Sequence, residues 1–115
     1  MSLENFLEKL SHSSESIDFA AVIALIDANY DFTPTAFQNG ETRNEAGQNS
    51  GSCKLFSFAQ LQNLSQVQTL ACFGAFYNVD VLENPTGDNH QNIRNFIKFG
   101  WEGIKFEGNA LSLKA

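Results

Sequence analysis

The sequence predicts a single α+β domain over residues 1–115, with about four helices packed on one face of a small antiparallel sheet containing two hairpins. The chain has 115 residues, which is about the length of one domain. Its expected strands are grouped together and do not alternate with helices, which favours an antiparallel sheet. Eleven Phe, two Tyr and one Trp can fill a core, since each buried aromatic removes roughly 150–250 Å² from water.

Two helices are expected at the start of the chain. Residues 2–12 carry Leu3, Phe6, Leu7 and Leu10 at helical spacing, and Ser2 can cap this helix. Residues 18–29 are apolar on nearly all sides, which is typical of a helix buried on more than one side. We therefore expect the second helix at the centre of the fold.

The middle of the chain is expected to be extended. Asn39-Gly40 lies between residues 35–38 and 41–44, and this dipeptide is a strong hairpin signal. Residues 44–52 are small and polar and predict a loop. Residues 53–59 are most simply a strand, although a helix from Phe56 onward is the alternative.

Capping patterns predict two more helices. Ser65 and Gln68 form a capping-box pattern before a helix that ends before Pro85. Asp88 and Gln91 form a second such pattern before a helix that runs to about Phe99, with Gly100 as its C-terminal glycine. Residues 104–107 and 110–113 then flank Gly108-Asn109 and predict the second hairpin.

The charge pattern excludes some partners. The net charge is −6, and the seven Lys and Arg are scattered along the chain. Nucleic acids and anionic membrane surfaces are bound through clustered positive charge, so neither partner is expected. No apolar run approaches the roughly 20 residues of a membrane span, and the N-terminus lacks the features of a secretory signal.

Cys53 and Cys72 are expected to be reduced thiols of a cytosolic protein. A zinc site would need both of them together with His12 and His90, and their spacing differs from that of zinc modules. We therefore expect no metal, and no pattern in the sequence calls for a cofactor.

Several blocks of the sequence carry a family resemblance that covers nearly the whole chain. They are Ile26–Phe37 (IDANYDFTPTAF), Asn44–Asn49 (NEAGQN), Gly51–Lys54 (GSCK), Thr69–Gly74 (TLACFG), His90–Phe96 (HQNIRNF) and Gly100–Ile104 (GWEGI). Together these blocks resemble the HopJ-type family of bacterial proteins, which are labelled type III effectors. The resemblance implies a protein of the bacterial cytoplasm that is secreted into a host cell through a type III system, and it implies no catalytic residues.

Three polar stretches are the candidates for a binding surface. The first ends the central helix, the second lies in the polar loop, and the third is one face of the last helix. Each also has a structural interpretation: helix termination, satisfaction of loop backbone groups, and a surface ion pair. The predicted binding residues are Asn29, Tyr30, Asp31, Glu45, Gln48, Asn49, His90 and Arg94.

The alternative function is a small cysteine-dependent hydrolase. Cys53 would be the nucleophile, His90 the base and Gln48 the oxyanion donor, in the chain order of papain-like proteases. Lys54 departs from that pattern, which has an aromatic residue there. We expect a non-enzymatic protein that binds an unknown protein or a small polar ligand, and the sequence leaves the oligomeric state open.

Overall fold

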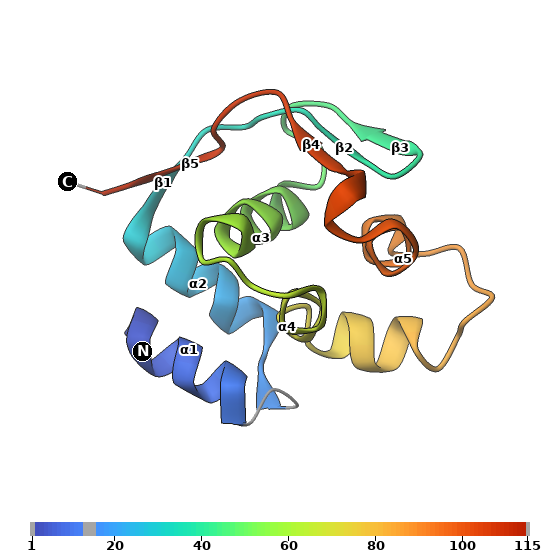
Figure 1. The fold of residues 1–115 in the computed structure, drawn as a ribbon, viewed down its shortest axis with the longest axis horizontal. Helices are drawn as coiled ribbons and strands as arrows, with labels where there is room; N and C mark the ends of the chain where they lie inside the picture. Colours follow the sequence, from blue (N-terminus) through green and yellow to red (C-terminus); the bar gives the residue numbers. More distant parts are fainter. Residues whose placement is uncertain (1, 13–15, 115) are drawn as a thin grey trace.

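The strands form two short antiparallel sheets that lie along one side of the helices (Figure 1). The computed structural model describes residues 2–12 and 16–114. One sheet pairs β1 (Tyr30–Phe32) with β5 (Leu111–Leu113). In the other, β2 (Phe37–Asn39) lies between β3 (Thr42–Asn44) and β4 (Ile104–Phe106). The predicted α+β class with antiparallel strands is confirmed.

The two predicted N-terminal helices are confirmed as α1 (Leu3–His12) and α2 (Phe19–Asn29). The Ser2 hydroxyl caps α1 by accepting a hydrogen bond from the backbone N–H of Asn5, at 3.1 Å. Helix α2 packs against α3 and buries Val22, Leu25 and Ile26. Ala20, Ala24 and Ala28 are exposed, so the prediction that this helix is buried on more than one side, at the centre of the fold, is wrong.

The predicted strand over residues 53–59 is wrong, because this segment belongs to helix α3 (Ser50–Leu61). The alternative, a helix from Phe56 onward, is right in type, but the helix begins earlier. The loop predicted over residues 44–52 is therefore shorter in the structure and ends at Asn49, before α3 begins. Cys53, Leu55, Phe56 and Phe58 are each at most 1% exposed. A helix enclosed on nearly all sides has an apolar run without a polar face, so its periodicity resembles that of a buried strand.

Helix α4 (Gln66–Ala71) begins with the predicted capping box. The Ser65 hydroxyl accepts from the Gln68 N–H at 3.1 Å, and the Gln68 side chain accepts from the Ser65 N–H at 3.0 Å. The predicted continuous helix is interrupted at Gly74 (φ +59°), and the chain resumes as the π-helix η2 (Phe76–Val81). A Cβ on Gly74 would lie 3.0 Å from the Ile17 carbonyl oxygen, so a close backbone approach coincides with the break.

Helix α5 (Gln91–Phe99) begins at Gln91, after His90 as the N-cap residue, so the predicted cap at Asp88 is wrong. The Gln91 side chain instead donates to the backbone carbonyl of Asp88. At the other end Gly100 (φ +63°) terminates the helix as predicted and leads into the 3₁₀ turn η3 (Gly100–Gly103).

The first hairpin is confirmed with its turn displaced by one residue. Asn39 pairs with Thr42, so Gly40 and Glu41 are the central turn residues. Gly40 has a φ of +60°, which suits a turn with glycine at its first central position.

The second predicted hairpin is wrong, because β4 pairs with β2 and β5 pairs with β1. Both pairings keep one register: Phe37 follows Tyr30 by seven residues, and their partners Phe106 and Leu113 are also seven apart. Residues 104–113 thus form an interrupted ribbon against residues 30–39. Pro34, which has no N–H to donate, lies in the interruption, and Gly108-Asn109 faces it across the ribbon.

The core that holds these elements together is centred on the Phe56 ring of α3. This ring contacts Phe37 of β2, Phe73 after α4, Phe96 of α5 and Trp101 of η3, with centroid distances of 5.0–6.3 Å. Edge-to-face and tilted contacts of this kind add to the gain from burial. The contacts fix α3 and α5 relative to one another and therefore position the pocket between their first turns.

Candidate binding pocket

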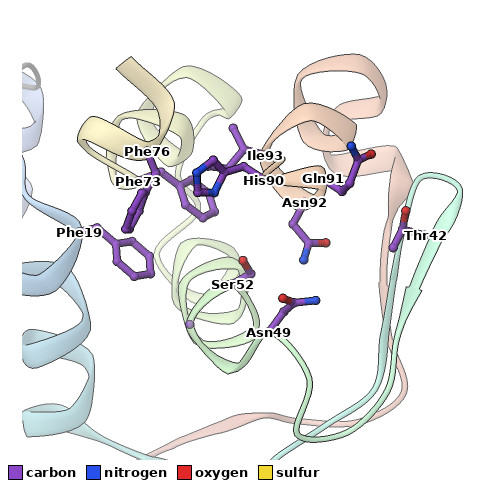
Figure 2. Close-up of a pocket in the computed structure, with 11 residues that line it drawn as sticks. Phe19, Thr42, Asn49, Ser52, Phe73, Phe76, His90, Gln91, Asn92 and Ile93 are labelled. Atoms are coloured by element: carbon purple, nitrogen blue, oxygen red, sulfur yellow. The ribbon is translucent and has the colours of Figure 1, made fainter. Parts of the chain in front are cut away.

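The first turns of α3 and α5 meet at an open pocket of about 500 Å³ (Figure 2). One side of the pocket is aromatic and the other is polar. The lining residues are Phe19, Thr42, Asn49, Gly51, Ser52, Phe73, Phe76, His90, Gln91, Asn92 and Ile93.

Three phenylalanines form the aromatic wall. The rings of Phe19 and Phe73 stack at 5.8 Å with an interplanar angle of 8°, and Phe76 meets Phe19 edge-on at 5.3 Å. Gly51 makes room for this wall, because a Cβ there would lie 3.0 Å from the tip of the Phe19 ring. Phe76 is 40% exposed, so a ligand can reach its ring.

The polar wall consists of two helix starts with the same unusual cap. Asn49 (φ +49°) precedes α3 and His90 (φ +52°) precedes α5, and neither side chain caps its own helix. Within the described residues, the N–H groups of Gly51, Ser52, Gln91 and Asn92 donate to no protein atom. Free first-turn N–H groups and the positive ends of two helix dipoles therefore lie at the pocket.

A cluster of four asparagines joins the two helix starts to the hairpin. We call Asn39, Asn44, Asn49 and Asn92 the asparagine cluster. Asn44 exchanges two hydrogen bonds with Asn92, at 3.0 and 3.1 Å, and accepts a third from Asn49 at 2.6 Å. Asn39 donates to the side-chain and backbone oxygens of Asn92, at 2.9 and 2.8 Å. Asn39, Asn44 and Asn92 are buried, so these bonds form where water does not compete.

His90 lies at the edge of the pocket in a fixed position. Its Nε2 atom is 3.0 Å from the Asp80 carboxylate on η2, and its ring lies 5.2 Å from that of Phe76. The imidazole therefore links η2 to the start of α5.

Of the predicted binding residues, the structure brings Asn49 and His90 together at the pocket. Glu45 and Gln48 lie in the exposed turn before Asn49, where the Glu45 N–H donates to the Gln48 side chain and the Glu45 carboxylate pairs with Arg43. Neither of the two lines the pocket.

Arg94 shares a helix with His90 but faces a different segment. Its guanidinium donates to the backbone carbonyls of Asn84 and Asn89 and to the Asn89 side chain. It thereby holds the segment between η2 and α5 and does not line the pocket.

Asn29, Tyr30 and Asp31 lie outside the pocket, at the junction of α2 and β1. The Asn29 side chain donates to the Leu25 carbonyl at 2.8 Å, which matches its structural interpretation as a helix-terminating residue. The Tyr30 ring is buried and its hydroxyl accepts from Gln62, while Asp31 is exposed.

Cys53 is placed as a core residue. It is 1% exposed, and its thiol donates to the Thr35 carbonyl at 3.5 Å. Burial raises the pKa of the Cys53 thiol, which disfavours the thiolate that a nucleophile needs. Cys72 is buried as well, and desolvation raises its pKa to about 12.

Most of the pocket lining was not predicted from the sequence. Phe19, Phe73 and Phe76 were indistinguishable from core phenylalanines, and Ser52 lay in the expected loop over residues 44–52 without being singled out. Asn39, Asn44 and Asn92 carried no local signal, because their side chains bond to one another across 48 or 53 residues of the chain.

The part of the chain that the structure describes holds neither a metal site nor a membrane-spanning helix. Within residues 2–12 and 16–114, no three His, Cys, Asp or Glu side chains gather as a metal site requires. Each helix in the same residues is too short or too polar to cross a membrane.

The sequence profile of the family described as "HopJ type III effector protein" matches residues 3–111. A solved structure described as "Crystal structure of unknown function protein VPA0580" is 54% identical to this chain. The alignment covers 99% of this chain and 95% of that one, with a TM-score of 0.97. A comparison with curated proteins gave no significant match.

Proposed function

The chain belongs to the HopJ type III effector protein family, and we propose that it is a non-enzymatic binding protein whose pocket takes a small polar ligand. The observation that carries this proposal is the pocket of about 500 Å³ with an aromatic wall on one side and unpaired polar groups on the other. Ligand sites typically combine apolar surface with a few convergent polar groups.

The rigidity of the pocket's polar wall supports binding over catalysis. The asparagine cluster and the His90–Asp80 contact hold the polar side in place before a ligand arrives, which lowers the entropic cost of binding. Cys53, the nucleophile of the hydrolase alternative, is buried with a raised thiol pKa, so no observation favours that alternative.

We extend the proposal to location: the protein is made in the bacterial cytoplasm and acts in a host cell after type III delivery. The family's description as an effector supports this. Fusion of the full chain to a reporter that is active only in host cytosol tests it. Signal is expected from a type III-competent strain, and equal signal from a strain lacking the system would contradict delivery.

A blocking substitution tests the pocket. Ser52→Leu places an isobutyl group at the pocket, whereas Ser112→Leu makes the same change on the exposed surface of β5. In a ligand-observed NMR screen of small polar compounds, we expect hits to bind the wild type and Ser112→Leu equally. Their Kd should rise at least about tenfold in Ser52→Leu, because the added side chain occupies the ligand's volume. Unchanged binding to Ser52→Leu would sink the proposal.

A further inference from the structure

We propose that the pocket selects an uncharged ring compound that donates hydrogen bonds along one edge and lays an apolar face on the phenylalanines. This inference rests on the proposed binding function and names the chemistry of its ligand. Its basis is the direction in which the amide side chains of the pocket are forced to point.

One backbone carbonyl fixes the orientation of the whole asparagine cluster. The carbonyl oxygen of Asn92 can only accept, so the group 2.8 Å away on Asn39 must be its NH₂. That NH₂ also meets the Asn92 side chain, which must therefore present its oxygen, at 2.9 Å. Asn44 must then donate to this oxygen and accept from the Asn92 NH₂.

Asn49 is the last amide in this chain of hydrogen bonds, and it is the exposed member of the asparagine cluster. Because the Asn44 oxygen is an acceptor, Asn49 must direct its NH₂ toward Asn44, at 2.6 Å. The Asn49 oxygen is left without a protein donor among the described residues, and in Figure 2 it lies on the side nearer Ser52. Asn49 therefore offers the pocket a fixed acceptor.

Gln91 repeats this arrangement across the pocket. Its NH₂ donates to the backbone carbonyl of Asp88, which can only accept, so its oxygen is also left as an acceptor. Thr42 accepts from the Asn95 side chain at 2.8 Å, and its hydroxyl hydrogen is free to donate. The pocket thus offers the Asn49 oxygen, with the Gln91 oxygen at its exposed edge, together with hydroxyl and backbone N–H donors.

The balance of charges at the pocket disfavours an anionic ligand. The two helix starts attract negative charge, but the amide oxygens of Asn49 and Gln91 repel a carboxylate or phosphate, and neither Lys nor Arg is among the lining residues. The chain's net charge of −6 adds long-range repulsion. A ligand that both donates and accepts, through hydroxyl groups or amide edges, satisfies the polar wall, and a ring face fits against Phe19 and Phe76.

Matched probe pairs test this directly at pH 8, by titration of ¹⁵N-labelled full-length protein. The pairs are glucose and glucuronate, uridine and uridine 5′-monophosphate, and benzamide and benzoate. We expect at least one uncharged member to shift the amide signals of Gly51, Ser52 and Gln91. Its Kd should be at least about tenfold lower than that of its anionic partner. The pair that responds identifies a sugar, a nucleoside or a simple amide as the source of the chemistry.

Gln91→Lys replaces one acceptor with a cation, and Asn5→Lys makes the same charge change on the exposed first turn of α1. Gln91→Lys should raise the Kd of the uncharged probe and lower the Kd of its anionic partner, each at least about fivefold. Asn5→Lys should change neither Kd. Equal or tighter binding of anions to the wild type overturns this inference and leaves the binding function standing. If no probe shifts the amide signals of the pocket at about 50-fold excess over the protein, on the order of millimolar concentrations, both this inference and the proposed binding function are overturned.

Discussion

Asn44 makes three side-chain hydrogen bonds at the end of β3, and through them it connects the starts of α3 and α5. Asn44 is 1% exposed and its partner Asn92 is also buried, so Asn92 cannot turn to water when Asn44 is removed. The sequence predicted Asn49 and His90 because each lies in an evidently polar stretch. It could not predict Asn39 and Asn44, because a strand residue's burial and its partner about 50 residues away depend on the tertiary fold.

Asn44→Ala should lower the free energy of unfolding by about 2–3 kcal/mol, since it leaves the buried NH₂ group of Asn92 without a partner. Asn109→Ala removes an exposed amide and should change the same quantity by less than about 0.5 kcal/mol. Urea denaturation followed by circular dichroism measures both variants. Equal losses in the two would show that the asparagine cluster contributes nothing specific.

At the scale of elements, local signals predicted the structure wherever they act over a few residues. The Ser65–Gln68 capping box and the Gly100 terminus were predicted correctly because their hydrogen bonds are local. Helix α3 was not, because its enclosure by the rest of the core removes the polar face that identifies a helix. The prediction of the second hairpin was wrong for a related reason. Residues 104–113 pair with residues 30–39, and the local sequence does not indicate a pairing partner so far away in the chain.

The close packing at the break between α4 and η2 can be tested by comparing substitutions at two glycines that both have a positive φ, Gly74 and Gly47. Gly74→Ala meets both the strain of a left-handed residue and a contact at 3.0 Å with the Ile17 carbonyl. Gly47→Ala meets only the strain, because nothing lies within 4 Å of its Cβ. Gly47→Ala should cost about 1–2 kcal/mol, and Gly74→Ala about 1–3 kcal/mol more. Thermal denaturation compares them, and a smaller loss at Gly74 would refute the close packing.

At the scale of the whole molecule, one aromatic core supports both sheets and the pocket. The Phe56 ring contacts residues from β2, the segment after α4, α5 and η3, so these four regions are stabilised together. The neighbouring Phe58 ring of the same helix contacts Phe6 of α1 and Tyr30 of β1. The phenylalanine content predicted a substantial core in a chain of 115 residues. Which rings form its centre and which line the pocket depends on helix positions that the composition does not encode.

Because the elements share this centre, unfolding should be one cooperative transition, with Trp101 fluorescence and far-ultraviolet circular dichroism changing together. Phe56→Ala should lower the free energy of unfolding by about 3–5 kcal/mol, because it opens a cavity in a fully buried site. Phe76→Ala, at a ring that is 40% exposed, should cost less than about 1.5 kcal/mol and weaken pocket ligands instead. Two separate transitions in the wild type would show that the elements do not share one core. Equal losses of stability in the two variants would show that Phe56 is no more important to the core than Phe76.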